Sequence, residues 1–169
     1  MNITAGIYKG RKIVAPDEKI TRPTLSKTRM GVFNTLFSLM GDFNGCSFLD
    51  VFGGSGIMGL EALSRGFSEV KVFEINKKSA EIIKKNYKTL GLIPDLTIGD
   101  SIKLLKNSET IYDVVYIDPP YQSDLYKEIL PIVKGEIIVL ESGNDIDTNN
   151  YEILKTKTYG GNTITFIKK

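Results

Sequence analysis

The 169-residue sequence contains no histidine and a single cysteine, Cys46. The lack of histidine excludes Ser-His-Asp and Cys-His catalysis and most zinc sites, and one cysteine cannot form a disulfide framework or a thiolate zinc site. No apolar run approaches the roughly 20 residues that span a bilayer, and the N-terminal residues lack the layout of a signal peptide. We therefore expect a cytoplasmic protein that works through carboxylates, amides, hydroxyls, aromatic rings or a bound cofactor and needs no metal.

The composition is that of a globular chain, with 41% hydrophobic and 25% charged residues. The net charge of +2 is unevenly placed, because residues 1–46 carry seven basic and three acidic groups. This local excess indicates a polyanion partner, although a solvated basic surface is the simpler alternative. The candidate contacts are Lys9, Arg11, Lys12, Arg22 and Arg29.

The hydrophobic pattern predicts an α/β fold. Residues 2–7 and 11–14 read as a hairpin, and a helix begins at Thr24 or Ser26 and ends near Met40. Strands are expected at 47–52, 69–74, 95–98, 112–117, 136–140, 152–157 and 163–167, with helices at 56–65, 77–90, 101–106 and 124–133. Such alternation predicts a mostly parallel sheet covered by helices on both faces. We expect one compact domain, in which a basic extension, 1–45, packs on a core, 46–169.

A glycine-rich turn, Gly54-Ser55-Gly56-Ile57-Met58-Gly59, lies between the first long strand and its helix and matches G-x-G-x-x-G. This pattern is typical of dinucleotide sites, where a pyrophosphate meets a helix N-terminus. The glycines could instead serve close packing of strand and helix. Asp50 precedes the turn and would repel a pyrophosphate but suit a cationic group.

Acidic residues also end the other expected strands, at Glu74, Asp100 and Asp118. Ligands of open α/β sheets bind at the carboxyl ends of the strands, so these side chains and Asp50 should converge there. The set fits S-adenosylmethionine, which has a sulfonium, an ammonium, a ribose diol and an adenine amine. Glu74 could also be a solvated acid at a strand end, and Asp100 a helix N-cap.

The segment Asp118-Pro119-Pro120-Tyr121 follows a buried strand. The prolines fix the backbone, so the Pro119 carbonyl points in one direction beside the Asp118 carboxylate. Two acceptors and an aromatic ring suit a planar heteroaromatic amine. A plain strand ending, with Asp118 as the next helix cap, is the alternative.

With both loops in view, the chain resembles the RsmD family of bacterial 16S ribosomal RNA guanine-N2 methyltransferases over nearly its whole length. The matching segments are 4–6, 9–12, 22–24 with Arg29, Phe33-Asn34, 50–56, 59–66, 99–100 and 118–121. Met30, Gly31, Gly53 and Ile57-Met58 depart from the family pattern, which usually has glutamate at the first position and alanine at the next two.

The resemblance implies an S-adenosylmethionine-dependent methyltransferase with a Rossmann-like fold. It implies cofactor contacts at Asp50, Phe52, Gly54, Gly56, Glu74, Ile75, Asp100, Ser101 and Thr24, and a target base held by Asp118, Pro119 and Tyr121. The implied partner is 16S rRNA, met in a partly assembled small subunit and held by the basic residues of 1–46.

Three other functions remain open on the sequence. Asp-Pro-Pro-Tyr also serves adenine-N6 and other amino-methyltransferases acting on DNA or another RNA, although no stretch is long enough for a separate target-recognition domain. A non-catalytic RNA-binding assembly factor and a nicotinamide dehydrogenase are the remaining alternatives. Nothing in the pattern indicates a dimer seam, so we expect a monomer.

Overall fold

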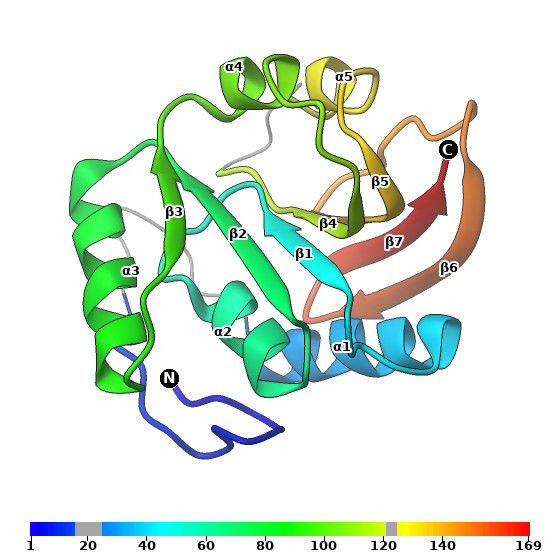
Figure 1. Ribbon diagram of the computed structural model, residues 1–169. Coiled ribbons are helices and arrows are strands. Elements are labelled where there is room, and N and C mark those ends of the chain that lie inside the picture. Colours follow the sequence, from blue (N-terminus) through cyan, green and yellow to red (C-terminus); the bar gives the residue numbers. More distant parts are fainter. Residues whose placement is uncertain (16–24, 121–124) are drawn as a thin grey trace.

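A mixed β-sheet forms the centre of the computed structural model, which describes residues 1–15, 25–120 and 125–169 (Figure 1). Within these ranges the sheet has seven strands in the order β3-β2-β1-β4-β5-β7-β6. Strands β1 to β5 are parallel, and β7 lies antiparallel between β5 and β6. The strands are β1 (Ser47–Asp50), β2 (Glu69–Glu74), β3 (Asp95–Ile98), β4 (Tyr112–Ile117), β5 (Gly135–Ser142), β6 (Glu152–Tyr159) and β7 (Asn162–Lys168).

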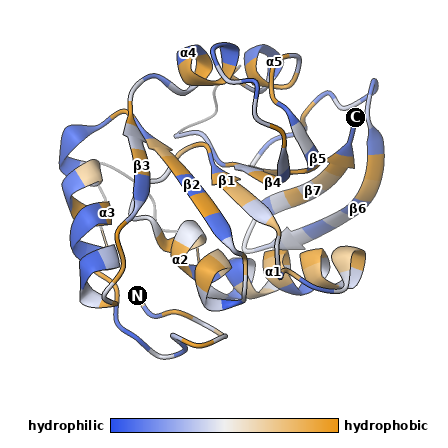
Figure 2. Cartoon of the chain, viewed as in Figure 1, coloured by the Kyte–Doolittle hydropathy of each residue, from blue (hydrophilic) through white to orange (hydrophobic). Residues whose placement is uncertain are grey.

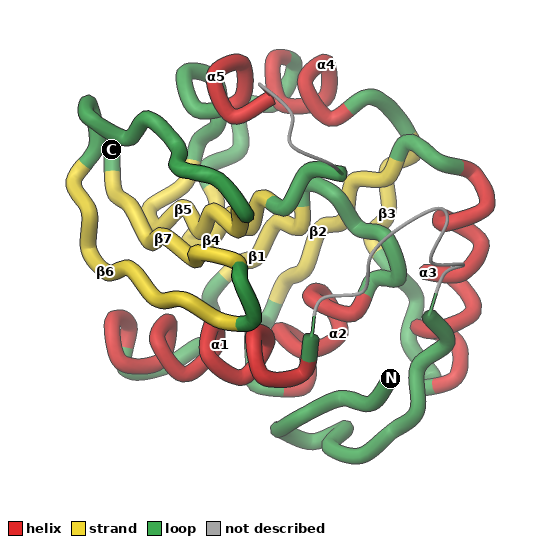
Figure 3. The backbone as a smooth tube through the Cα atoms, turned by 180° about the vertical axis from the view of Figure 1, so that it is seen from behind, coloured by secondary structure: helices red, strands yellow, loops and turns green. Residues whose placement is uncertain are grey.

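Helices cover both faces of the sheet, as the two opposite views show (Figures 1 and 3). One layer holds α1 (Ser26–Met40), α2 (Ile57–Ser64) and α3 (Lys77–Thr89), and the other holds α4 (Ser101–Lys106) and α5 (Leu125–Ile129). Apolar residues recur in the central strands (Figure 2), because both of their faces are buried. The α/β prediction, with a mostly parallel sheet between two helical layers, is confirmed.

Successive side chains of a strand point to opposite faces of the sheet, so the hydrophobic core has two parts. Phe48 and Tyr116 pack towards α1 and α2, where Phe33 is fully buried. Leu49 and Val115 point to the other face and pack with residues of α4 and α5. The predicted limits of β2, β3, β4 and α4 match the structure, whereas β1 ends at Asp50 rather than at 52.

The N-terminal segment is less regular than the predicted hairpin. Its pairing is an isolated antiparallel bridge between Asn2 and Lys12, outside any strand. The segment is instead fastened to α2, whose Ser64 carbonyl accepts the Ile7 N–H at 2.8 Å. Gly6 has φ +80°, and a Cβ there would lie 1.7 Å from the Ser64 carbonyl oxygen, so only glycine fits this contact.

The buried carboxylate of Glu61 organises this attachment. Its Oε1 accepts the Thr4 N–H at 2.8 Å, and its Oε2 accepts the Thr4 hydroxyl at 2.9 Å. Two arginines also bind it, Arg29 from α1 at 3.2 Å and Arg65 at 3.3 Å. Glu61 therefore links the N-terminal segment, α1 and α2 at one point.

The prediction that Arg29 binds RNA is wrong, because this side chain is 1% exposed. Besides Glu61, its guanidinium binds the Asn2 carbonyl at 2.7 Å and the Ser26 hydroxyl at 3.2 Å. Two large apolar side chains of α1 face solvent, since Phe37 is 56% exposed and Met30 46%. The buried face consists of Thr28, Arg29, Val32, Phe33 and Leu36.

Two glycines that depart from the family pattern have packing reasons. A Cβ on Gly31 would lie 2.2 Å from Cζ of Tyr159, so the tyrosine ring occupies the space that an alanine needs. A Cβ on Gly53 would lie 2.4 Å from Cγ1 of Val72. Both positions are therefore matched to large neighbours in this chain.

Glu61→Gln should lower the free energy of unfolding by about 3–5 kcal/mol, because it removes the charge that pairs with a buried guanidinium. Urea unfolding followed by circular dichroism measures the loss. Glu81→Gln is the matched control, since Glu81 is 71% exposed in its ion pair with Lys84 and should cost less than about 1 kcal/mol. Equal stability of the two variants would contradict the anchoring role of Glu61.

Candidate active site

The candidate site, called the crevice below, is the edge of the sheet at the carboxyl ends of the parallel strands, where the strand order switches from one side of β1 to the other. From β1 the chain moves outward to β2 and β3, and then returns to the other side of β1 as β4 and β5. Ligands of open α/β sheets bind beyond the carboxyl ends of the strands at such a switch point. Asp50 pairs with Tyr116 in the parallel register, so the segments after β1 and β4 leave the sheet side by side.

Asp50 is a buried acid at the end of β1, and its side chain is 1% exposed. Burial raises the pKa of this carboxyl to about 7, the Phe52 N–H lowers it, and the nearby Glu74 carboxylate raises it. The Phe52 N–H donates to Oδ1 at 3.3 Å, which begins the turn after the strand. A cation bound beside these two acids would favour the ionised form of Asp50.

Glu74 ends β2 and is fixed by two backbone groups. Gly54 N–H donates to Oε2 and Asn76 N–H donates to Oε1, both at 2.7 Å. An ionised carboxylate has about four acceptor sites, so each oxygen keeps capacity for a further donor such as a ribose hydroxyl. Glu74 is 8% exposed, which does not fit the alternative of a fully solvated strand-end acid.

The glycines of the turn have structural reasons of their own. Gly56 has φ +77°, and a Cβ there would lie 3.2 Å from both Ile83 and Tyr87 of α3. A Cβ on Gly59 would lie 2.4 Å from the Tyr87 hydroxyl. Close packing thus accounts for these two positions, while Gly54, with φ +56°, positions the N–H that Glu74 accepts.

Asp100 and Ser101 lie at the start of α4, after β3. Asp100 caps the helix by accepting the Lys103 N–H at 2.9 Å, which is the alternative that the sequence left open. The buried Ser101 hydroxyl donates to the Val51 carbonyl at 2.7 Å and ties this helix to the end of β1. The segments that follow β1 and β2 each carry an apolar side chain. Phe52 after β1 is half-buried, and Ile75 after β2 is 63% exposed.

The second loop begins directly after β4. Asp118 is half-buried, Pro119 is buried and Pro120 is exposed. Burial chiefly raises the pKa of Tyr116, and the Glu141, Asp118 and Asp50 carboxylates raise it further. Carboxylates at the ends of β1, β4 and β5 therefore all influence one buried hydroxyl, which agrees with strand ends that converge. Predicted site residues Tyr121, Thr24 and Arg22 lie outside the described residues.

Sequence reasoning missed Glu141. Ile117 pairs with Leu140, so Glu141 follows beside Asp118 at the same edge. It is 3% exposed, and its carboxylate accepts the Tyr116 hydroxyl and, at 2.8 Å, the Asn162 side-chain amide. The sequence pattern could have indicated Glu141, because it is an acid at the end of a buried apolar run. Glu74 and Asp118 show the same pattern.

The basic residues of the described N-terminal segment, 1–15, are exposed. Lys9, Arg11 and Lys12 lie on its surface, and the Arg11 guanidinium donates to the Thr89 carbonyl at 2.8 Å. Val14, just after them, bonds through its N–H and its carbonyl to the side chain of Asn86, each at 2.9 Å. The same Asn86 amide donates to the Ser55 carbonyl, so this segment is joined to the glycine turn.

The sheet has the strand order and the antiparallel β7 of S-adenosylmethionine-dependent methyltransferases, with acids at the ends of β1 and β2 beside the glycine turn. The chain therefore belongs to that class of protein. The solved structure of the Escherichia coli protein yhhF superimposes with a TM-score of 0.85 at 25% identity, covering 100% of this chain and 97% of that one. No helix within the described ranges has the length and apolar character needed to cross a membrane.

Residues 1–168 match the model of the family described as Conserved hypothetical protein 95, and the chain belongs to that family. Ribosomal RNA small subunit methyltransferase D of Haemophilus influenzae is 31% identical over 95% of this chain and 89% of its own length. The Bacillus subtilis protein YlbH is 31% identical over 98% and 91%. The RsmD resemblance is thereby confirmed at the level of the family.

Asp50 should make the cofactor-free protein less stable as pH rises. Its pKa rises from 3.8 to about 7 on folding, so the folded state holds the proton more tightly. The contribution of this group to the free energy of unfolding therefore falls as the pH rises from 3.8 to about 7. Asp50→Asn should remove that fall, so the variant gains stability over the wild type up to pH 7, measured by urea unfolding at several pH values. Asp147→Asn, at an exposed site, is the control. Parallel stability curves for Asp50→Asn and the wild type would contradict the buried acid.

Proposed function

We propose that this chain transfers a methyl group from S-adenosylmethionine to the exocyclic N2 amine of a guanine in 16S rRNA, within a partly assembled small subunit. The observation that carries the proposal is the adjacency of two loops. A buried acid ends β1, and Asp118 with Pro119 follows β4, its direct neighbour in the sheet. Supporting it, the name of the Haemophilus relative is that of a small-subunit rRNA methyltransferase.

The donor half of the crevice is formed by the ends of β1, β2 and β3. When bound, S-adenosylmethionine supplies an electrophilic methyl group on a cationic sulfonium. Asp50 provides negative charge for the cationic amino acid part, Glu74 accepts the ribose hydroxyls, and Asp100 accepts the adenine amine. The proposed set also contains Phe52, Gly54, Gly56, Ile75, Ser101 and Thr24.

The acceptor half holds the base. Guanine N2 is a poor nucleophile because its lone pair is delocalised into the ring. Hydrogen bonds from its two N–H groups to the Asp118 carboxylate and the Pro119 carbonyl favour a pyramidal nitrogen and stabilise its growing positive charge. The nitrogen loses a proton after transfer, and the Asp118 carboxylate accepts it. Tyr121 stacks on the base, which offsets part of the cost of unstacking it from the RNA.

The basic N-terminal segment binds the RNA backbone. Lys9, Arg11 and Lys12 are exposed on a segment fixed by Glu61 at one end and Asn86 at the other. Phosphate contacts of this kind release counterions, so binding should weaken steeply with salt. Arg22 belongs to the same proposed set, while Arg29 does not, because Glu61 holds it in the interior.

Methyl transfer from labelled S-adenosylmethionine to free 16S rRNA, to small subunits lacking the modification and to duplex DNA tests the proposal. Mass analysis of nucleosides from the labelled RNA should then show N2-methylguanosine. Label in DNA, or in adenine or cytosine, would assign a different amino-methyltransferase. Absence of label with intact cofactor binding by calorimetry would favour the assembly-factor alternative.

Asp118→Asn should lower kcat about 100-fold or more, as expected when a preorganised acceptor of developing charge is lost. The affinity for S-adenosylmethionine, measured by calorimetry, should stay within about twofold, because Asp118 serves the acceptor half. Asp145→Asn, at an exposed loop position, is the matched control and should leave both quantities unchanged. Equal losses in kcat and cofactor affinity would show that Asp118 is structural.

Lys12→Ala should weaken RNA binding uniformly across sequences and reduce the slope of log K against log salt by about one. Lys106→Ala, an equally charged and exposed change on α4, should leave the slope unaltered. Filter binding of 16S rRNA over a salt series measures both. An unchanged slope for Lys12→Ala would place the RNA elsewhere.

A further inference from the structure

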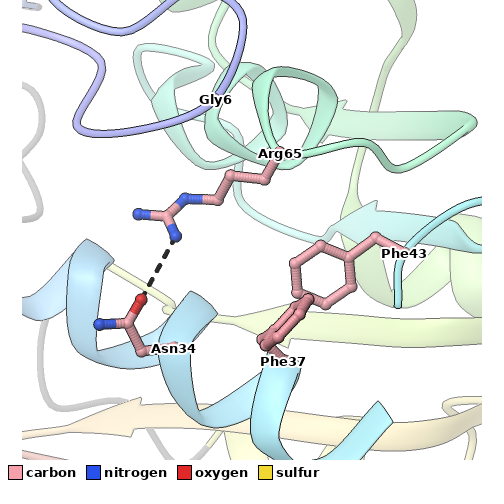
Figure 4. Close-up of a pocket in the computed structure, with 5 residues that line it drawn as sticks. All are labelled: Gly6, Asn34, Phe37, Phe43 and Arg65. Atoms are coloured by element: carbon pink, nitrogen blue, oxygen red, sulfur yellow. Dashed lines mark hydrogen bonds between the residues drawn. The ribbon is translucent and has the colours of Figure 1, made fainter. Parts of the chain in front are cut away.

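A pocket of about 310 Å³ lies away from the crevice, at the amino-terminal edge of the sheet. Arg65 directly follows α2, and Phe43 lies in the loop before β1, which fixes this location. Gly6, Asn34 and Phe37 complete the lining (Figure 4). The volume is at the lower end of the range of about 300–1,000 Å³ found for ligand sites, which suits one nucleotide rather than a folded segment.

Arg65 forms the polar wall of this pocket, and its position is fixed. Its Nε binds Glu61 at 3.3 Å, its Nη2 donates to the Thr4 hydroxyl at 2.9 Å, and the guanidinium lies 5.0 Å over the Phe33 ring. Nη1 reaches Asn34 Oδ1 at 3.5 Å, the dashed contact in Figure 4. A bond of this length is weak, so a better acceptor could take this donor.

Phe37 and Phe43 form the aromatic side of the pocket, and their rings lie beside each other (Figure 4). Phe37 is 56% exposed, although its ring meets the buried Phe43 edge-on, with centroids 5.8 Å apart. Phe43 is in turn stacked on Phe67 at 4.4 Å, so the exposed ring rests on a packed base. An exposed ring held in this way is a platform on which a planar base can stack.

Charged residues of both signs surround the pocket. Arg65 is part of the lining, and the exposed Asp42 directly precedes Phe43. The exposed Lys9 of the N-terminal segment follows Gly6 by three residues. Unpaired RNA is recognised by stacking of splayed bases on aromatic rings combined with hydrogen bonds from arginine and amide groups.

We infer that this pocket binds one unpaired nucleotide of the RNA substrate, with its base stacked on Phe37 and an oxygen or ring nitrogen accepting the N–H of Arg65. This contact rests on the proposed RNA substrate. It is separate from the crevice, because the pocket and the crevice lie at opposite ends of the parallel strands. It would fix a second point of the RNA relative to the target base.

The chain lacks tryptophan, so Phe37→Trp places a single tryptophan in the pocket, whose fluorescence can be excited apart from that of tyrosine. Titration with short unpaired RNA of each base should quench this fluorescence by stacking. Ile111→Trp, at a position 63% exposed before β4, is the matched control and should not respond. No quenching of Phe37→Trp, or equal quenching of both, would overturn the inference. Quenching by small subunits but by no unpaired RNA would assign the pocket to a protein contact and also overturn it.

Phe37→Ala should raise the KM for the RNA substrate roughly tenfold, within the range for loss of one base–aromatic stack. The kcat and the cofactor affinity should stay unchanged, and Phe37→Tyr should restore the KM. An unchanged KM for Phe37→Ala would contradict the nucleotide site. The quenching measurement needs no methyl transfer, so it stays decisive even if the proposed activity is not found.

Discussion

The buried carboxylate of Glu61 is the contact on which the placement of the N-terminal third depends. It is fully buried and accepts hydrogen bonds from Thr4, Arg29 and Arg65, which lie on three different segments. Buried ion pairs cost desolvation and add little net stability, but removal of one partner is expensive. Glu61 therefore acts mainly by specifying one arrangement, because any shift of the segment or of α1 leaves charge unpaired in the interior.

The attachment of the N-terminal segment also connects it to the crevice. Helix α2 begins at the glycine turn and ends at Ser64, where the N-terminal segment is fastened. The other end of that segment is held by Asn86, which also binds the Ser55 carbonyl in the turn. The exposed basic side chains between these two anchors thus have a fixed relation to the donor half of the site. Under the proposed function, this fixed relation aligns the methyl donor with the RNA.

Much of the fold could be predicted because local signals and tertiary packing agree. Strands β2, β3 and β4 are short apolar runs bounded by turn residues, and their limits were predicted correctly. Arg29 was misassigned because its partner, Glu61, is distant in the sequence, and local periodicity does not show a buried ion pair. Glu141 was missed for a related reason, since only the register of β5 against β4 places it beside Asp118.

The glycine turn shows why motif and electrostatics must be considered together. Gly56 and Gly59 are required by the packing of α3, so the G-x-G-x-x-G pattern alone does not identify a ligand. Charge adds a preference among ligands, because burial raises the pKa of Asp50 to about 7 and the nearby Glu74 carboxylate raises it as well. A pyrophosphate would add negative charge to acids that already disfavour ionisation, whereas a cationic ligand relieves their repulsion. Under the proposed function, this electrostatic preference accounts for a sulfonium cofactor at a dinucleotide-like turn.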